Sequence, residues 1–437
     1  MTTNLSSRPP ADRASAAPAA EGGASAAPAP RRLGYPGVLL LLAGALVLLS
    51  LVRSVTDEGS LTATGQWSAA ITFAVPIGLA GLAGLWAERS GVVNIGLEGM
   101  MMLGLFGAGW AGWQWGPWAA VFAGIVGGAL GGLVHAVATV SFGVDHIVSG
   151  VAINILAQGV VQFLAKQWFG QEGSAAAAAG GNDKQSPSMD RMEPFTVPGL
   201  ADWLGDLADK HWFLVSDLAG ILGAAVHEVS WLTLLAVVLF LGSHLVLWRT
   251  SFGLRLRSCG ENPQAAESLG VNVYLYKYAA LAVSGALAGL GGAYLAVLIR
   301  MYQDGQTGGR GYLGLATMIF GNWRPGGIAA GAGLFGFMDA LQTRGGGAVV
   351  HATLLLFGLG LAGLAVWQFT RGRRLQAGVN AGLAVLLWLW FATTDEMPLE
   401  LVTASPYLTT LLVLTLFSQR LRAPRAAGRP YRRGQAT

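Results

Sequence analysis

Residues 67–86 read WSAAITFAVPIGLAGLAGLW and contain no charged side chain. A helix needs about 20 predominantly apolar residues to cross the hydrocarbon core of a bilayer, and this stretch provides them. Comparable apolar stretches occur along the whole chain, at residues 34–52, 91–112, 117–140, 146–168, 230–248, 277–299, 312–344, 348–368, 376–394 and 406–419. The sequence therefore predicts an all-α integral membrane protein that crosses the bilayer many times.

The amino-acid composition supports this class. Of 437 residues, 53% are hydrophobic and 11% are charged, and the mean hydropathy is +0.52. Soluble domains carry roughly 25% charged residues, so these values exclude a soluble enzyme and a disordered protein. The formal net charge of +4 does not indicate nucleic-acid binding, because the basic residues lie beside apolar stretches, where they orient membrane helices. The single cysteine, Cys259, excludes an intramolecular disulfide.

Charge asymmetry predicts the topology, because Lys and Arg concentrate on the cytoplasmic side of membrane proteins. Three basic clusters follow apolar stretches; they are Arg249, Arg255 and Arg257, then Arg371, Arg373 and Arg374, and finally the six arginines from Arg420 to Arg433. We therefore predict that both termini are cytoplasmic, with residues 1–33 as a disordered tail and residues 420–437 as a basic tail. Residues 169–228 hold nine acidic residues against three lysines and arginines, which predicts an extracytoplasmic loop.

Two termini on one side of the membrane require an even number of crossings. Residues 34–419 then form a transmembrane domain of about ten to twelve helices, with the 312–344 stretch broken into short pieces at residues 322–327. The heptapeptide at residues 94–100 resembles that at residues 312–318. Since the two copies start on opposite sides in this topology, we predict an inverted repeat with short or broken helices. Such repeats place a solute path between the two halves.

Polar residues inside apolar stretches mark either helix–helix contacts or a solute path, because polar groups that face lipid are costly. Asn94 and Glu98 are four residues apart, which places them on one face of the predicted helix. Asn154 and Gln158 repeat this spacing. Hydrogen bonds that tie helices together and a polar lining for transport explain these pairs equally well. The candidate residues of a translocation pathway are Asn94, Glu98, Asn154, Gln158, Thr317 and Asn322.

The sequence motifs of several catalytic classes are missing. No G-x-x-x-x-G-K-[ST] loop occurs and no lysine follows a glycine, so the chain cannot hold ATP phosphates in that manner. No H-E-x-x-H pair and no G-x-S-x-G turn occurs either. We therefore predict no catalytic residue, no metal site and no cofactor bound by this chain, which is then not an enzyme.

The connection at residues 253–270 carries the signals of a short helix. Asn262 followed by Pro263 is typical of a helix start, with asparagine as the N-cap and proline in the first turn. Residues 264–269 would form a short amphipathic helix, which Gly270 ends. A short helix at the membrane surface suits the docking of another protein, and an ordered loop without a partner is the alternative.

Two motifs resemble those of a known family. Gly260, Asn262, Ala265, Ala266 and Gly270 resemble the coupling-helix region of ABC importer permeases that serve ribose, branched-chain amino acids and nucleosides. Residues 88–100, ERSGVVNIGLEGM, resemble the signature of the nucleoside-type permeases, which work with lipoproteins of the basic-membrane-protein type. The resemblance implies an ATPase-coupling helix region with Gly253, Arg255, Gly260, Glu261, Asn262, Pro263, Ala265, Ala266 and Gly270.

The resemblance implies a multi-pass permease of the bacterial cytoplasmic (inner) membrane that moves a nucleoside or a related ribosyl or sugar solute. Its partners would be an ABC ATPase that binds ATP, an extracytoplasmic substrate-binding lipoprotein and a second permease subunit, identical or related. Residues 345–405 depart from the family pattern and are predicted to be an insertion with two extra helices. The alternative from another class is an ion-coupled secondary transporter of a small polar solute. It would need intramembrane carboxylates, for which Glu98 and Asp339 are the candidates.

Overall fold

The computed structural model describes residues 35–395, 397–398, 400–404 and 421–432. The predicted tail at residues 1–33 and the last predicted apolar stretch, 406–419, lie outside the described residues. The chain divides into two compact units, residues 1–44 and 45–437. In the first unit, residues 35–44 form the beginning of helix α1 (Tyr35–Thr56). Every contact described below lies within the second unit.

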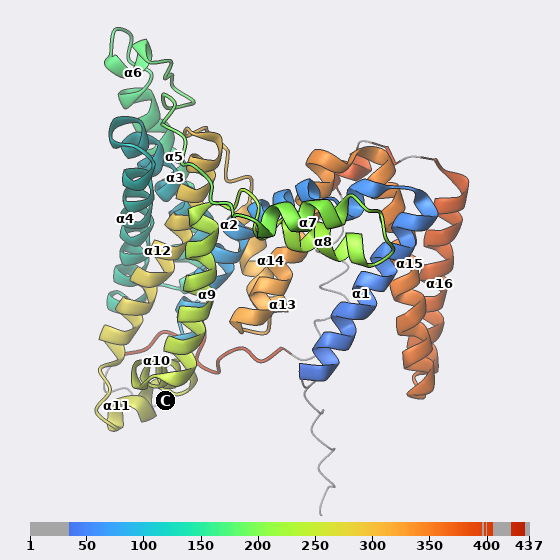
Figure 1. Cartoon of the computed structure of the whole chain (residues 1–437). Coiled ribbons are helices and arrows are strands. Elements are labelled where there is room, and N and C mark those ends of the chain that lie inside the picture. Colours follow the sequence, from blue (N-terminus) through green and yellow to red (C-terminus); the bar gives the residue numbers. More distant parts are fainter. Residues whose placement is uncertain (1–34, 396, 399, 405–420, 433–437) are drawn as a thin grey trace, which may run out of the picture. The chain divides into compact units, whose positions relative to one another are not determined.

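Long helices dominate the second unit (Figure 1). They are α2 (Thr64–Arg89), α3 (Leu97–Trp115), α4 (Pro117–Ala136), α5 (His146–Trp168), α9 (Trp231–Arg249), α12 (Val273–Ile299), α15 (Gly346–Thr370) and α16 (Arg374–Thr393). In the described part of the chain, seven helices are long and apolar enough to cross a membrane: all of these except α3, with α4 extended to Ser141. The predicted apolar stretches from 34–52 to 376–394 all form helices, so the all-α membrane fold is confirmed.

Shorter helices occupy the connections. They are η1 (Gly59–Thr62), α6 (Ala175–Ala178), α7 (Leu200–Ala208), α8 (Val215–Gly223), α10 (Ser251–Glu261) and α11 (Pro263–Ser268). The predicted break in the 312–344 stretch separates α13 (Arg310–Phe320) from α14 (Pro325–Ala340). Asn322 and Trp323 have positive φ angles of 51° and 53° and Pro325 begins α14, so the chain cannot continue as one helix here.

Glycines bring α4 and α12 into backbone contact. A Cβ atom on Gly128 would lie 2.2 Å from the carbonyl oxygen of Gly285, and one on Gly289 would lie 2.2 Å from that of Gly124. No side chain fits at such distances, so these glycines are what allows the two helices to pack this closely. α3 approaches the same seam, because a Cβ on Gly104 would lie 2.4 Å from the Cα of Gly289.

The start of α3 differs from its prediction. The apolar stretch begins at residue 91, but the helix begins at Leu97, and Gly91 has a φ of +89°. Asn94 therefore lies in the non-helical segment before α3, and the prediction that it shares a helix face with Glu98 is wrong. The heptapeptide at residues 94–100 straddles a helix start, whereas residues 312–318 lie wholly inside α13. The inverted repeat stays a prediction.

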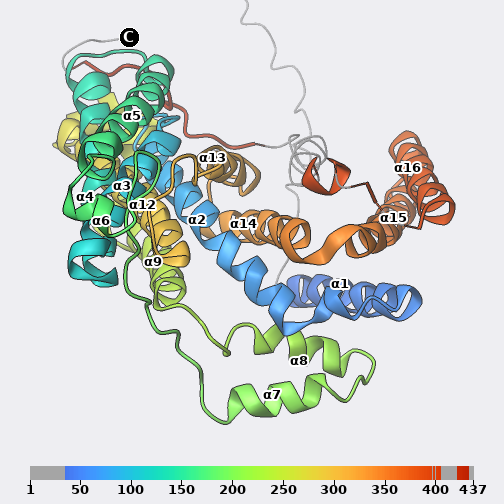
Figure 2. The ribbon, with the colours of Figure 1, turned by 90° about the horizontal axis from the view of Figure 1, so that it is seen from above.

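Residues 169–228 fold into a packed connection. α7 and α8 run side by side as a helical hairpin (Figures 1 and 2). In α8, the fully buried Asp217 forms an ion pair with Arg53 of α1 at 2.9 Å. Residues 345–405 hold α15 and α16, which pack against each other. That residues 345–405 are an insertion stays a prediction.

Candidate translocation pathway and coupling surface

A buried carboxylate joins the first turns of α3 and α13. Glu98, in the first turn of α3, is 3% exposed. Its Oε1 accepts the N–H of Gly309 at 3.0 Å, and its Oε2 accepts the N–H of Gly311 at 2.7 Å. The first N–H groups of a helix lack intrahelical acceptors and attract negative charge. One carboxylate therefore serves the starts of two helices from distant parts of the chain.

The side-chain amide of Asn154 completes this junction from α5. Its Oδ1 accepts the N–H of Gly99 at 2.8 Å. Its Nδ2 donates to the carbonyl oxygen of Ile95 and to the hydroxyl oxygen of Tyr312, both at 3.0 Å. Asn154 thus connects α5 with the start of α3 and with α13.

Asn94 ties the segment before α3 to α12. Its Nδ2 donates to the Oγ of Ser284 at 3.0 Å, and its Oδ1 accepts the N–H of Gly96 at 3.0 Å. Asn94 is fully buried. Three predicted pathway residues, Asn94, Glu98 and Asn154, therefore belong to one buried hydrogen-bonded junction. For Asn94 and Glu98 these bonds favour the interpretation that the side chains tie helices together.

A polar stripe on α5 begins at this junction. Asn154, Gln158 and Gln162 are spaced four residues apart and lie along one helix face; we call them the α5 stripe. Gln158 and Gln162 are exposed, and the Nε2 of Gln162 donates to Asp304 Oδ2 at 3.1 Å. Tyr312, which is bonded to Asn154, is 49% exposed beside the stripe.

Exposed amides on a membrane-spanning helix need water or protein in front of them. An amide without a hydrogen-bond partner costs about 2–7 kcal/mol in an apolar medium. The α5 stripe therefore marks a face that borders an aqueous path or another protein surface. The spacing in the sequence identified Asn154 and Gln158 but missed Gln162, which lies one step further in the same pattern. Tyr312 was missed because only its hydrogen bond to Asn154, which depends on the fold, marks it as part of this face.

The other two candidate residues lie away from the α5 stripe. Thr317 is fully buried inside α13, where its Oγ1 donates to the carbonyl oxygen of Gly314 at 2.7 Å. Asn322 lies in the turn between α13 and α14, and its Oδ1 accepts the N–H of Arg422 at 2.8 Å. Neither side chain joins the buried junction.

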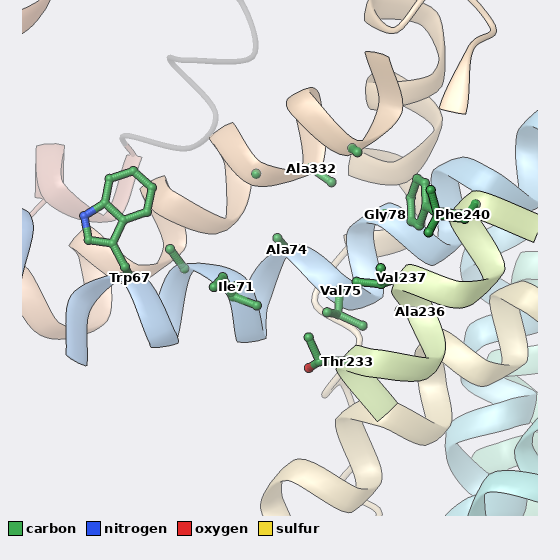
Figure 3. A pocket seen from close by; sticks show the side chains of 14 residues that line it. Trp67, Ile71, Ala74, Val75, Gly78, Thr233, Ala236, Val237, Phe240 and Ala332 are labelled. Carbon is green, nitrogen blue, oxygen red and sulfur yellow. The ribbon is translucent and has the colours of Figure 1, made fainter. Parts of the chain in front are cut away.

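A separate apolar groove lies between α2, α9 and α14 (Figure 3). Its walls include Trp67, Ile71 and Val75 of α2 together with Phe240 of α9. The hydroxyl of Thr233, which also lines the groove, is hydrogen-bonded to that of Tyr294 at 3.1 Å. Because these walls offer a polar solute almost no hydrogen-bond partners, the groove suits acyl chains or apolar side chains.

The predicted docking element consists of two short helices beyond the ends of α9 and α12 (Figure 1). Residues 251–261 form α10, where the sequence indicated a loop. Thr250 caps this helix by accepting the N–H of Gly253 at 3.1 Å, and Leu256 is fully buried beneath it. Many residues of α10 are polar and its buried face is narrow, so the sequence pattern did not indicate this helix.

α11 confirms the predicted short helix. Asn262 Oδ1 accepts the N–H of Ala265 at 3.0 Å, Pro263 begins the helix, and Gly270 follows it with a φ of +82°. Pro263 and Ala266 are buried, whereas Ala265 is exposed and Leu269 is 84% exposed. A rigidly capped helix therefore presents an apolar side chain outward, as a protein-binding site requires.

α10 is in backbone contact with the turn that leads into α3. A Cβ on Gly260 would lie 2.3 Å from the carbonyl oxygen of Arg89. Arg255 is exposed on the other side of α10, and Cys259 is buried beneath it. Burial raises the pKa of the Cys259 thiol to about 11, so it stays protonated and poorly nucleophilic at neutral pH. α10 is therefore packed directly against the segment that leads to Glu98.

Comparisons with known proteins identify related chains. A family model described as "Branched-chain amino acid transport system / permease component" matches residues 67–365. The guanosine ABC transporter permease protein NupQ of Bacillus subtilis (strain 168) is 33% identical over 379 residues, which cover 84% of this chain and 96% of the relative. The nucleoside ABC transporter permease protein NupC of Lactococcus lactis subsp. cremoris (strain MG1363) is 32% identical over 370 residues, which cover 83% and 94%. No solved structure is a significant match.

Proposed function

The chain belongs to the family of branched-chain amino acid transport system permease components, and on that basis we propose that it is the membrane subunit of an ABC importer for a nucleoside. It is a multi-pass membrane protein and a transport permease. The names of its relatives support a nucleoside as the cargo. The observation that carries the proposal is the α5 stripe, a row of amides on a membrane-spanning helix of which Gln158 and Gln162 are exposed.

The α5 stripe has the chemistry that a nucleoside requires. The amides of Gln158 and Gln162 each offer donors and an acceptor, which match the polar edge of a base and the hydroxyl groups of ribose. The ring of Tyr312 offers an aromatic face beside them. A second permease subunit, identical or related, would face α5 and close the path, so that the stripe borders water rather than lipid.

Other subunits supply the energy and the cargo. In this proposal an ABC ATPase docks on α11 and hydrolyses ATP, while this chain binds no nucleotide and makes no covalent chemistry. A substrate-binding lipoprotein delivers the nucleoside at residues 169–228 on the outer side of the bacterial cytoplasmic membrane. Because α10 touches the backbone of Arg89, ATPase movement at α11 would shift the start of α3 and change which side the path opens to.

Both carboxylates that ion coupling would need are engaged. Glu98 accepts two backbone N–H groups, and Asp339 forms an ion pair with Arg310 at 3.2 Å. A carboxylate that couples ion movement must exchange its partner for the ion, which these bonds oppose. The arrangement therefore supports drive by an ATPase over the secondary-transport alternative.

We expect the Ala265→Asp variant to lose ATPase coupling. Ala265 is exposed on α11, and a carboxylate buried unpaired in a docking interface costs about 2–5 kcal/mol. Transport-stimulated ATP hydrolysis and nucleoside uptake in proteoliposomes should fall by about ten-fold or more. Ala63→Asp, which places the same charge at an exposed position between η1 and α2, is the matched control and should behave like the wild type. Normal uptake by the Ala265→Asp variant would contradict the docking of the ATPase on α11.

We expect the double variant Gln158→Leu/Gln162→Leu to fold normally and to transport poorly. Leucine suits an exposed face of a membrane helix, but it removes hydrogen bonds worth about 1 kcal/mol each from a passing nucleoside. Radiolabelled guanosine uptake should fall by about ten-fold or more, with thermal stability unchanged. Val160→Leu, an exposed apolar site on α5, is the control. Competition by unlabelled ribose and glucose tests the cargo class, and uptake unaffected by the double variant would contradict the path.

A further inference from the structure

The described part of the C-terminal segment lies across the coupling helices (Figure 1). Residues 421–432 are called the C-terminal strap. The N–H of Ala426 donates to the carbonyl oxygen of Gly260 at 2.9 Å, and the N–H of Gly428 donates to that of Gly91 at 3.3 Å. The strap is therefore fixed by its backbone to α10 and to the turn between α2 and α3.

The strap has one buried face and one basic face. Pro424, Ala426 and Tyr431 are buried against the protein. The four arginines of the strap are exposed: Arg422, Arg425, Arg429 and Arg432. No acidic residue occurs between residues 421 and 432. The sequence predicted a simple basic tail, whereas in the structure residues 421–432 form an ordered segment whose arginines face outward.

The strap also engages both acidic residues of the coupling region. The N–H of Arg425 donates to Glu261 Oε2 at 3.4 Å, and the hydroxyl of Tyr431 donates to Glu267 Oε2. Residues 253–270 contain two arginines and two glutamates, so on their own they are neutral. With both carboxylates hydrogen-bonded to the strap and four arginines added, the combined surface is strongly positive.

Two of the arginines face α11 across a hollow. Arg425 and Arg429 form one wall of a cavity of about 830 Å³, and Glu261, Asn262 and Gln264 form the other. Arg422 and Arg432 do not line it. The hollow lies beside the N-terminus of α11, so a partner that docks on the exposed face of this helix meets Arg425 and Arg429 as well.

We propose that the C-terminal strap and α11 form one composite docking surface, and that Arg425 and Arg429 bind an acidic element of the ATPase. This proposal rests on the proposed function. Complementary charge at an interface raises the association rate and excludes wrong partners. Anionic lipid headgroups are the other negatively charged partner that arginines bind. Arg425 and Arg429, however, line a hollow shared with α11, which lies beyond the ends of α9 and α12, and this position favours the ATPase.

Charge reversal at the hollow tests this proposal. The permease is purified in nanodiscs of neutral phosphatidylcholine, and the affinity of its ATPase is measured at low and at physiological salt. We expect Arg425→Glu/Arg429→Glu to raise the Kd by about ten-fold or more and to weaken its salt dependence. Arg422→Glu/Arg432→Glu makes the same charge change on the same strap, away from the hollow, and should alter the Kd by less than about three-fold.

Two further measurements distinguish an effect of charge from misfolding of the strap, and binding of the ATPase from binding of lipid. Arg425→Lys/Arg429→Lys keeps the charge and should bind the ATPase like the wild type, whereas a misfolded strap would not be rescued. Sedimentation with phosphatidylcholine vesicles, with and without phosphatidylglycerol, measures lipid binding. If Arg425→Glu/Arg429→Glu keeps normal ATPase affinity, or weakens only phosphatidylglycerol binding, the strap proposal is overturned. An equal loss of ATPase affinity in Arg425→Glu/Arg429→Glu and in Arg422→Glu/Arg432→Glu would also overturn it.

The Ala265→Asp variant keeps this failure distinct from a failure of the proposed function. If Ala265→Asp loses the ATPase while the strap variant retains it, α11 docks the ATPase alone and only the strap proposal falls. If both variants retain full affinity, the ATPase docks elsewhere and the coupling role of α11 falls as well.

Discussion

Gly128→Leu is expected to prevent the permease from folding. A Cβ at this position would lie 2.2 Å from the carbonyl oxygen of Gly285, and the neighbouring atoms are backbone that cannot swing aside. Overpacking of a core costs about 1–3 kcal/mol even where side chains can adjust. Here α4 and α12 would have to separate along their whole seam, which would remove a large part of a total stability of about 5–15 kcal/mol.

Size-exclusion chromatography of the detergent-solubilised variant provides the measurement. We expect a monodisperse yield below about one tenth of the wild-type yield, because a loss close to the whole free energy of unfolding leaves most chains unfolded and prone to aggregation. Gly242→Leu is the matched control. Gly242 lies in the middle of α9, and a Cβ there would meet no described atom within 4 Å. A well-folded Gly128→Leu protein would contradict the close backbone contact between α4 and α12.

Glu98→Ala is expected to cost both stability and transport. The substitution leaves the buried N–H of Gly311 and the part-buried N–H of Gly309 without their acceptor. A buried unsatisfied donor costs about 1–3 kcal/mol and a part-buried one less, so the loss of stability is at least about 1–3 kcal/mol. Glu98→Gln keeps one acceptor oxygen but loses the negative charge that two helix starts attract, and we expect an intermediate loss.

Thermal unfolding in detergent and guanosine uptake in proteoliposomes measure the two effects. The melting temperature should fall in the order wild type, Glu98→Gln, Glu98→Ala, and uptake should follow the same order. Asp395→Ala removes an exposed carboxylate from the segment after α16 and should change neither quantity. Wild-type stability of Glu98→Ala would mean that the junction between α3 and α13 does not hold the helices together.

Local signals in the sequence predicted much of this fold. Apolar length located the helices, and short-range chemistry located the start of α11. Asp145 caps α5 by accepting the N–H groups of Ile147 and Val148, and Asn262 caps α11 in the same way. The partners in these caps are two or three residues away, so the residue order alone contains the information.

Features that depend on distant partners could not be predicted. Asn94, in the non-helical segment before α3, bonds to Ser284, 190 positions away, and this contact leaves no mark on the sequence near residue 94. The role of Glu98 depends on Gly309 and Gly311 in the same manner. The arginines of residues 421–432 indicate a tail by composition, and only their long-range backbone bonds reveal an ordered strap.

The amides of α5 bear on how the protein matures in the cell. In a newly inserted copy the exposed amide of Gln158 would face acyl chains until some other surface covered it. That uncovered state would have a higher free energy than the covered one, because an amide without a hydrogen-bond partner is poorly solvated by hydrocarbon. Proteases that survey the membrane for unstable chains would therefore remove surplus copies first, and the abundance of the complex would be set by its scarcest component.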